Sequence, residues 1–212
     1  MNFDINRMKY IANSMFERVL LWDLKKQQQD FTFDWTDTGI GSEKYTWEEL
    51  PDQWKQQVQH DFIIYSGESN FWVSEMKKIN YNRDFFKKKY NEDKLYITKS
   101  KIQKLINDTR VNFDEKYKPY IITSHPNGDF YFFDLLNIEL ISDEQSCQAD
   151  DHSDFSTKEK QMKEVYWLDF NSATKYNLEK YSEQKTTQRV LYHCAKKTGI
   201  KEYKTLNIKK PS

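Results

Sequence analysis

Two strand-like runs that flank a short turn constrain this chain more than any other feature of its sequence. They cover residues 60–65 and 70–78, and the turn between them reads SGES, which predicts a β-hairpin. The second run is unusual because Glu75 and Lys77 interrupt its apolar residues. Side chains two residues apart on a strand point to the same face, so these two charges are expected to lie side by side. A fold built on this hairpin must accommodate a carboxylate and an ammonium group together on one face of a sheet.

The length of the turn predicts a third charged group near this pair. If the loop consists of residues 67–69, counting back along the partner strand places Asp61 directly opposite Glu75. Two neighbouring carboxylates repel each other unless a cation lies between them, and their hard oxygen atoms suit Mg²⁺ or Mn²⁺. An ammonium beside such a cation, here that of Lys77, can orient or deprotonate an attacking water and stabilise charge on a phosphate. The hairpin therefore predicts a metal site suited to phosphodiester hydrolysis.

The hydrophobic pattern elsewhere predicts a mixture of helices and strands. Apolar residues at helical spacing predict a helix over residues 5–26, with Phe16, Val19 and Trp22 in its buried stripe. A second helix is expected over residues 98–110, capped by Thr98 or Ser100. The sequence further predicts irregular structure or short strands at 27–50, a short helix around Pro51, a hairpin of strands 120–123 and 130–133 around a turn at 125–128 that His125 helps to shape, a strand at 165–168 and a helix at 183–197. We therefore expect an α/β domain with a mixed central β-sheet.

Several of these segments together resemble the PD-(D/E)xK nuclease superfamily over about residues 5–136. His60 stands where the family name has a proline. The resemblance implies a restriction-endonuclease-like fold, in which an initial helix lies beside a four-stranded mixed sheet and a second helix packs on that sheet. It rests on Asp61, thirteen intervening residues and Glu75-Met76-Lys77, then a helix containing Lys99-Ser100-Lys101-Ile102-Gln103, and a second hairpin ending in Phe132-Phe133-Asp134-Leu135.

The same resemblance implies roles for individual residues. Asp61 and Glu75 would bind Mg²⁺ or Mn²⁺ together with the backbone carbonyl of Met76, and Lys77 would be the catalytic lysine. Many members add a glutamate on the first helix, for which Glu17 is the candidate by position. Glu17 lies opposite the predicted buried stripe, so it reaches the site only if its own side of the helix packs on the sheet. The implied activity is that of a Mg²⁺-dependent endonuclease acting on DNA.

Local charge favours a nucleic-acid partner although the whole chain is neutral. Lys and Arg number 33, as do Asp and Glu, so net charge names no partner. Residues 76–110 carry eleven basic and four acidic side chains, whereas residues 139–159 carry seven acidic and one basic. Residues 87–89, all lysine, fit either a phosphate contact or a solvated, flexible loop. The residues expected to bind nucleic acid are Lys78, Arg83, Lys87, Lys88, Lys89, Lys99, Lys101, Gln103 and Lys104.

Length and composition limit the class of protein. A chain of 212 residues can bury the core of one sizeable domain without disulfides or a structural metal. Its two cysteines and four scattered histidines exclude a disulfide scaffold and a Cys-rich zinc site. Charges interrupt every apolar stretch of the first 22 residues, so we expect no signal peptide, no membrane span and a cytoplasmic location.

The chain is expected to contain a core and an extension. Residues 1–140 would form the nuclease-like core, and residues 141–212 a family-specific extension packed on it, with a mobile acidic loop at 142–159. A homodimer is expected because cutting both strands generally needs two active sites. Two other functions fit the same residues. The fold could bind nucleic acid or a protein partner without cleavage, or Glu75 and Lys77 could be an ordinary surface pair of an interaction protein in mobile-element or defence biology.

Overall fold

The computed structural model of the chain describes residues 16–17, 19–28, 30–35, 62–67, 69–148 and 160–198. Helical residues 16–17 and 19–27 are called the first helix below. The predicted helix around Pro51 and the candidate ligand Asp61 lie outside the described residues. The elements that follow the first helix are β1 (Phe31–Trp35), β2 (Phe62–Ser66), β3 (Asn70–Lys78), α3 (Arg83–Tyr90), β4 (Lys94–Thr98), α4 (Lys99–Asn112), β5 (Tyr117–Ser124), β6 (Asp129–Asp134), β7 (Ile141–Gln148), β8 (Lys160–Asp169), η1 (Phe170–Ser172), β9 (Thr174–Asn177) and α5 (Glu183–Thr198).

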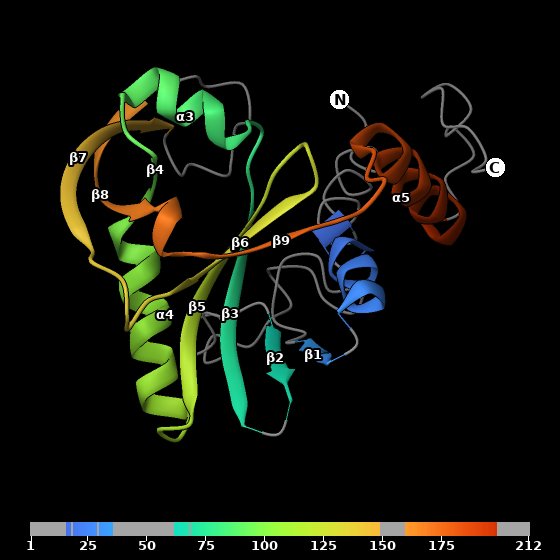
Figure 1. Ribbon diagram of the computed structural model, residues 1–212, viewed down its shortest axis with the longest axis horizontal. Coiled ribbons are helices and arrows are strands. Elements are labelled where there is room, and N and C mark those ends of the chain that lie inside the picture. Colours follow the sequence, from blue (N-terminus) through green and yellow to red (C-terminus); the bar gives the residue numbers. More distant parts are fainter. Residues whose placement is uncertain are drawn as a thin grey trace.

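Six strands form the main sheet in the order β1-β2-β3-β5-β6-β9. Neighbouring strands are antiparallel except β3 and β5, which run parallel. Parallel neighbours need a long crossover, and α3, β4 and α4 supply it between β3 and β5 (Figure 1). The predicted α/β fold with a mixed central sheet is confirmed. It includes the initial helix and the second packed helix that the resemblance implied, although the sheet has six strands rather than four, because β1 and β9 extend it at its two edges.

A second sheet consists of three antiparallel strands in the order β4-β8-β7. Strand β7 occupies the start of the acidic segment, so the expectation of a loop was wrong for residues 142–148; residues 149–159 lie outside the described part. The polar residues of β7 carry no strand pattern, and pairing with β8 along its whole length supplies its backbone hydrogen bonds. Strands β8 and β9 also pair with β4 and β6, across the expected boundary at residue 140. The division into core and extension stays a prediction.

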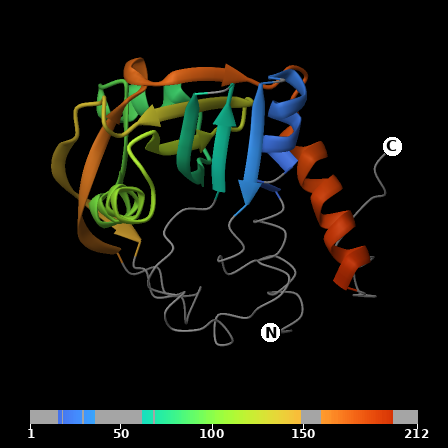
Figure 2. The same cartoon turned by 90° about the horizontal axis from the view of Figure 1, so that it is seen from below.

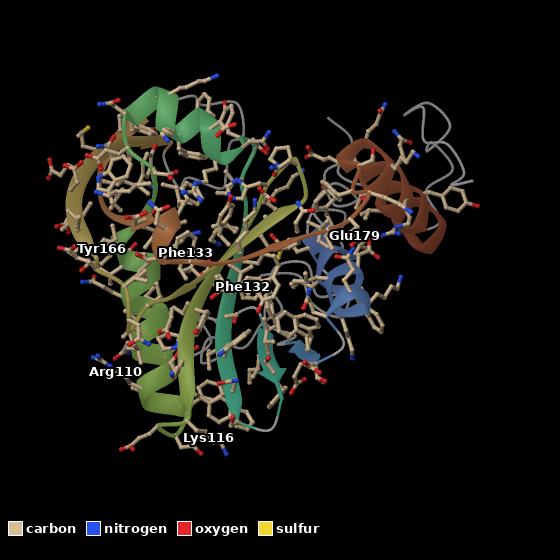
Figure 3. All side chains as sticks on the ribbon, viewed as in Figure 1. Arg110, Lys116, Phe132, Phe133, Tyr166 and Glu179 are labelled. Atoms are coloured by element: carbon tan, nitrogen blue, oxygen red, sulfur yellow. The ribbon has the colours of Figure 1, made fainter. Side chains whose placement is uncertain are left out.

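The main sheet separates two hydrophobic cores. On one face, the first helix and α5 pack against the side of the sheet that presents Met76 and Phe132. On the other face, α3, α4 and the second sheet pack against Val73 and Phe133. Figure 2 shows the first helix and α5 on one side of the sheet, and α4 with the second sheet on the other. Neighbouring Phe132 and Phe133 on β6 therefore belong to different cores, as strand alternation requires (Figure 3).

The first helix buries a different face from the one predicted. Leu20, Leu21 and Leu24 are buried against the sheet, whereas Trp22 is 58% exposed. The predicted stripe was therefore wrong at Trp22, because three leucines at spacings of one, three and four residues offer a wider apolar surface. Glu17 lies one helical turn from Leu21, on the side that packs. The side of the helix that carries Glu17 therefore packs on the sheet, but on the face that presents Met76.

Of the two helices in the crossover, only α4 was predicted from the sequence. Helix α4 confirms the predicted helix, with Ile102 and Leu105 buried, although the side chain of Thr98 at the N-cap position makes no capping hydrogen bond. Residues 83–90 form helix α3 rather than the flexible loop considered for residues 87–89. Phe86 is buried and Phe85 and Tyr90 pack beside it, but an eight-residue helix with three lysines is too short for a clear periodic signal. Across the described residues, none of the helices is long and apolar enough to cross a membrane.

Candidate functional site

The hairpin of β2 and β3 has the register that the sequence predicted. Ser66 pairs with Asn70 and Phe62 with Ser74, so residues 67–69 form a three-residue loop. Gly67 adopts a positive φ of 64°, a conformation that glycine reaches without the steric cost of a Cβ. The described register ends at Phe62, one residue after Asp61. The placement of Asp61 opposite Glu75 therefore stays a prediction.

Glu75 and Lys77 form an ion pair on one face of β3, between Lys77 Nζ and Glu75 Oε1. The side chain of Glu75 is only 13% exposed and that of Lys77 only 27% exposed. Both lie on the face that presents Val73 to the core beneath α4, while the Met76 side chain is buried in the opposite core. Since β2 and β5 flank β3, it is a central strand of the sheet. The pair is therefore not a charge placed on a free sheet edge to prevent aggregation.

Strand β5 adds a hydrogen-bonded pair beside Lys77 that sequence reasoning missed. Lys77 pairs with Thr123 in the parallel register, so the two side chains share a face. Thr123 Oγ1 lies 3.1 Å from His125 Nε2, and His125 Nδ1 lies 2.7 Å from the carbonyl oxygen of Tyr81. Because a carbonyl only accepts, Nδ1 carries the proton, and Nε2 accepts from the Thr123 hydroxyl. No local pattern signals the placement of Thr123 beside Lys77, since it depends on how β5 lies beside β3.

Burial keeps His125 neutral. The side chain is enclosed, and desolvation lowers the pKa of its imidazole below the ordinary value, against the opposing effect of the hydrogen bond to the Tyr81 carbonyl. The predicted role of His125 in the turn is also confirmed, since its backbone N–H donates to the Asp129 carbonyl at 2.9 Å and its own carbonyl accepts from the Gly128 N–H at 3.0 Å. A neutral imidazole therefore holds the Thr123 hydroxyl in one orientation on the face that carries Lys77.

This arrangement predicts a pH dependence of stability. The unfolded chain takes up a proton at His125 below about pH 6.5, whereas the buried imidazole resists it, so the free energy of unfolding should fall as the pH drops from about 7 to 5. The His125→Gln variant should be less stable at pH 7, and its stability should decline less steeply over this interval. Urea unfolding of both proteins at a series of pH values measures the two slopes. Equal slopes would mean that His125 is not held neutral.

Glu17 and Glu75 project from opposite sides of the main sheet. The first helix, with Glu17 half-buried on it, packs on the face that presents Met76, whereas Glu75 lies on the face that presents Val73. The role of Glu17 in the site stays a prediction.

The residues expected to bind nucleic acid lie on β3, α3 and α4. Four already have partners within the protein: Lys78 pairs with Glu183 at 2.7 Å, Arg83 with Asp93, Lys99 with Glu164 at 2.9 Å, and the Gln103 amide lies 3.5 Å from the Tyr166 hydroxyl. Phosphate binding by these residues requires an exchange of partner. Five further lysines are exposed on the two helices, whether or not they also have contacts within the protein: Lys87, Lys88 and Lys89 in the last turn of α3, and Lys101 and Lys104 on α4.

Among the described residues, the site supplies one of the two carboxylates expected to bind a hard cation. In the part of the chain that the structure describes, no three His, Cys, Asp or Glu side chains converge to hold a metal. Glu75 supplies one carboxylate, which is the ligand type that Mg²⁺ and Mn²⁺ prefer. The second predicted carboxylate belongs to Asp61, outside the described residues. A metal at this position therefore remains a proposal.

Comparisons with known proteins yield a likeness in structure. No family model matches the sequence, and no curated protein matches it. Among solved structures, the chain is similar to Hjc, a Holliday junction resolvase from Archaeoglobus fulgidus, with 16% sequence identity and a TM-score of 0.39. The match covers 73% of this chain and 86% of the resolvase chain. A likeness of this size says nothing about substrate or activity, which must be inferred from the chain's own residues.

Proposed function

We propose that this protein is a Mg²⁺- or Mn²⁺-dependent endonuclease that hydrolyses phosphodiester bonds in DNA. The observation that carries this proposal is the ion pair of Glu75 and Lys77, largely enclosed on one face of a central strand. Enclosing two charges costs free energy. Their position on a central strand therefore indicates a purpose other than stability. A carboxylate can bind a cation and an ammonium can stabilise charge on a phosphate, and metal-assisted phosphodiester hydrolysis uses both.

Each residue has a separate task in the proposed site. Glu75 and Asp61 would hold the metal together with the Met76 carbonyl, and a bound Mg²⁺ would polarise a phosphate oxygen and lower the pKa of its water. Lys77 keeps an ammonium beside Glu75, where it stabilises negative charge on the phosphate and orients the attacking water. The Thr123 hydroxyl, fixed by His125, presents a polar group on the same face.

Binding of the nucleic acid is assigned to the exposed lysines of α3 and α4. Lys87, Lys88 and Lys89 project from the C-terminal turn of α3, and Lys101 and Lys104 from α4. Their contacts with phosphates would be independent of sequence and sensitive to salt. A homodimer would bring two such sites to the two strands of a duplex.

The test of this function is cleavage by the purified protein. Supercoiled plasmid and linear duplex DNA should be nicked or cut with Mg²⁺ or Mn²⁺, and EDTA should stop the reaction because it removes the metal. Ca²⁺ should support binding with little turnover, and single-stranded RNA serves as a comparison substrate. Binding of DNA without cleavage in any metal would contradict the proposal and favour a binding module on the same fold.

A further inference from the structure

A pocket of about 370 Å³ opens on the second sheet, beside the C-terminal end of α3. Tyr90 of α3, Glu92 and Lys94 after it, Asp143 of β7 and Trp167 of β8 line it, with two further residues of β7. This volume lies within the range of small-ligand sites. None of the proposed catalytic residues belongs to this pocket.

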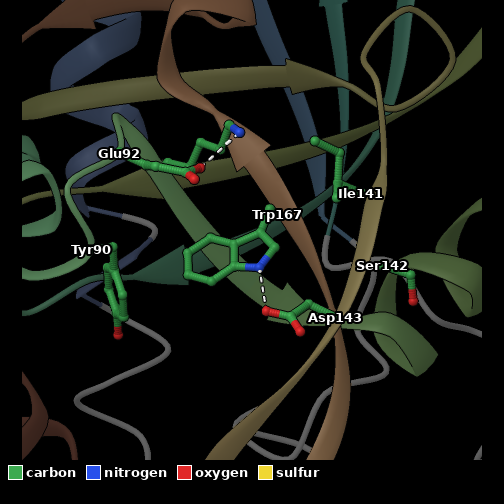
Figure 4. Close-up of a pocket in the computed structure, with 7 residues that line it drawn as sticks. Tyr90, Glu92, Ile141, Ser142, Asp143 and Trp167 are labelled. Atoms are coloured by element: carbon green, nitrogen blue, oxygen red, sulfur yellow. Dashed lines mark hydrogen bonds and ion pairs between the residues drawn. The ribbon is translucent and has the colours of Figure 1, made fainter.

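An aromatic surface that is fixed before any ligand binds forms the floor of the pocket. The Trp167 ring meets Tyr90 edge-to-face, with ring centres 5.1 Å apart, and meets Tyr96 in the same way at 5.3 Å. The Trp167 indole N–H donates to Asp143 Oδ2 at 3.0 Å, which fixes the plane of the ring. Figure 4 shows the broad face of the indole between the carboxylates of Glu92 and Asp143, with Tyr90 beside it. Flat, preorganised rings of this kind suit a planar ligand that stacks.

The polar groups of the pocket are mainly hydrogen-bond acceptors. Asp143 accepts from the Trp167 indole, the Gln145 amide and the Glu144 backbone N–H, and these bonds lower the pKa of its carboxyl, which is therefore ionised. Asp143 Oδ1 accepts from the Glu144 N–H at 2.8 Å and has a lone pair left for a ligand. Lys94 Nζ already pairs with Glu92 at 2.8 Å. The lining therefore favours a planar ligand that donates hydrogen bonds and disfavours a phosphate.

The rim next to the pocket has the opposite charge. Lys87, Lys88 and Lys89 form the turn of α3 that leads into Tyr90, and Lys89 Nζ lies 4.8 Å from the centre of the Tyr90 ring. These cations would repel a positively charged peptide approaching the pocket. They would attract the phosphates of a strand whose base enters it.

We infer that this pocket binds an unpaired nucleobase that carries an exocyclic amino group, in a strand whose phosphates lie along Lys87, Lys88 and Lys89 of α3. The base stacks on Trp167, and its amino group donates to the carboxylate of Asp143. Cytosine and adenine present such a donor, whereas thymine presents a carbonyl at the same position. The inference rests on the nucleic-acid binding of the proposed function and specifies its substrate as DNA with unpaired bases.

Binding measured without metal tests the inference independently of cleavage. In EDTA, fluorescence anisotropy should show tighter binding of a single-stranded cytosine oligonucleotide than of a thymine oligonucleotide or a fully paired duplex of equal length. Trp167→Leu should weaken cytosine binding by roughly 5- to 150-fold, since stacking on one aromatic side chain contributes that much. Trp167→Phe, which keeps a ring, should retain most of the affinity and shows that loss in the leucine variant does not reflect misfolding.

Two further variants separate recognition of the base from attraction of the phosphates. Asp143→Asn keeps an acceptor for the Trp167 indole but replaces a carboxylate oxygen with an amide N–H₂, so the preference for cytosine over thymine should shrink or reverse. Replacing Lys87, Lys88 and Lys89 by Ala should weaken the binding of both oligonucleotides by the same factor. Met162→Ala serves as the matched control on β8, since Met162 is 64% exposed and lies outside the pocket.

The inference is overturned if Trp167→Leu binds both oligonucleotides like the wild type, or if Asp143→Asn leaves the base preference unchanged. It is also overturned if tetramethylammonium, and not deoxycytidine, shifts the Trp167 indole N–H resonance in ¹⁵N-labelled protein, because the pocket is then a site for organic cations. Base-selective binding without cleavage would support the pocket while contradicting the nuclease. Cleavage with no base preference in binding would support the nuclease while contradicting the pocket.

Discussion

The Glu75→Gln variant should lose at least about 100-fold of the metal-dependent cleavage rate, while its fold and stability stay near those of the wild type. Glutamine removes the negative charge that binds the cation but keeps an oxygen that accepts from the Lys77 ammonium, so the ion pair becomes a hydrogen bond. Initial rates of plasmid nicking in Mg²⁺ and Mn²⁺, with circular dichroism of both proteins, provide the comparison. Asp61→Asn should show a loss of similar size.

Glu115→Gln is the matched control for this experiment. Glu115 is exposed where α4 leads into β5, and the same chemical change there should leave cleavage unaltered. DNA binding by Glu75→Gln in Ca²⁺ should weaken far less than cleavage, because the lysines of α3 and α4 bind the phosphates. Cleavage that survives Glu75→Gln would identify a different active site or a contaminating nuclease.

The Phe133→Ala variant should lose about 3–5 kcal/mol of its free energy of unfolding. Phe133 is fully buried between the main sheet and the elements of the α3 and α4 side, with the Phe170 ring centre 6.1 Å away. Truncation to alanine removes a buried aromatic ring from the hydrophobic core. It leaves a cavity that the surrounding strands cannot readily close. Since a domain is typically stabilised by only about 5–15 kcal/mol, this change approaches the limit of folding.

Urea unfolding followed by circular dichroism measures this loss. Phe133→Leu should cost clearly less, because it keeps most of the apolar volume. Leu136→Ala provides the exposed control, since Leu136 is 51% exposed just after β6 and its truncation should change stability by less than about 0.5 kcal/mol. A loss below about 1 kcal/mol for Phe133→Ala would mean that the core on this face is not packed as described.

Short-range patterns in the sequence determined the hairpin of β2 and β3, helix α4 and the hairpin of β5 and β6. Turn residues set the three-residue loop at 67–69, and strand alternation along β3 places Glu75 and Lys77 together on one face. Helix α4 was predictable because Ile102 and Leu105 recur at helical spacing. In each case the deciding interactions join residues close together in the chain.

Tertiary structure alone decided the elements whose partners are distant in sequence. Strand β7 has a polar, acidic sequence and is a strand because β8 satisfies its backbone groups, just as β9 depends on β6. The first helix turned its leucines rather than Trp22 to the sheet, because packing selects the face with the larger apolar surface.

The residues that surround the two candidate sites could not be predicted from the sequence either. Thr123 lies beside Lys77 only through the parallel register of β3 and β5, which a long crossover leaves unspecified. Trp167 meets Asp143 and Tyr90 only through the second sheet and α3. The chain's local chemistry thus determined which charged residues share one strand face. The long-range pairing of strands decided what surrounds them, because contacts between distant segments leave no periodic trace in the sequence.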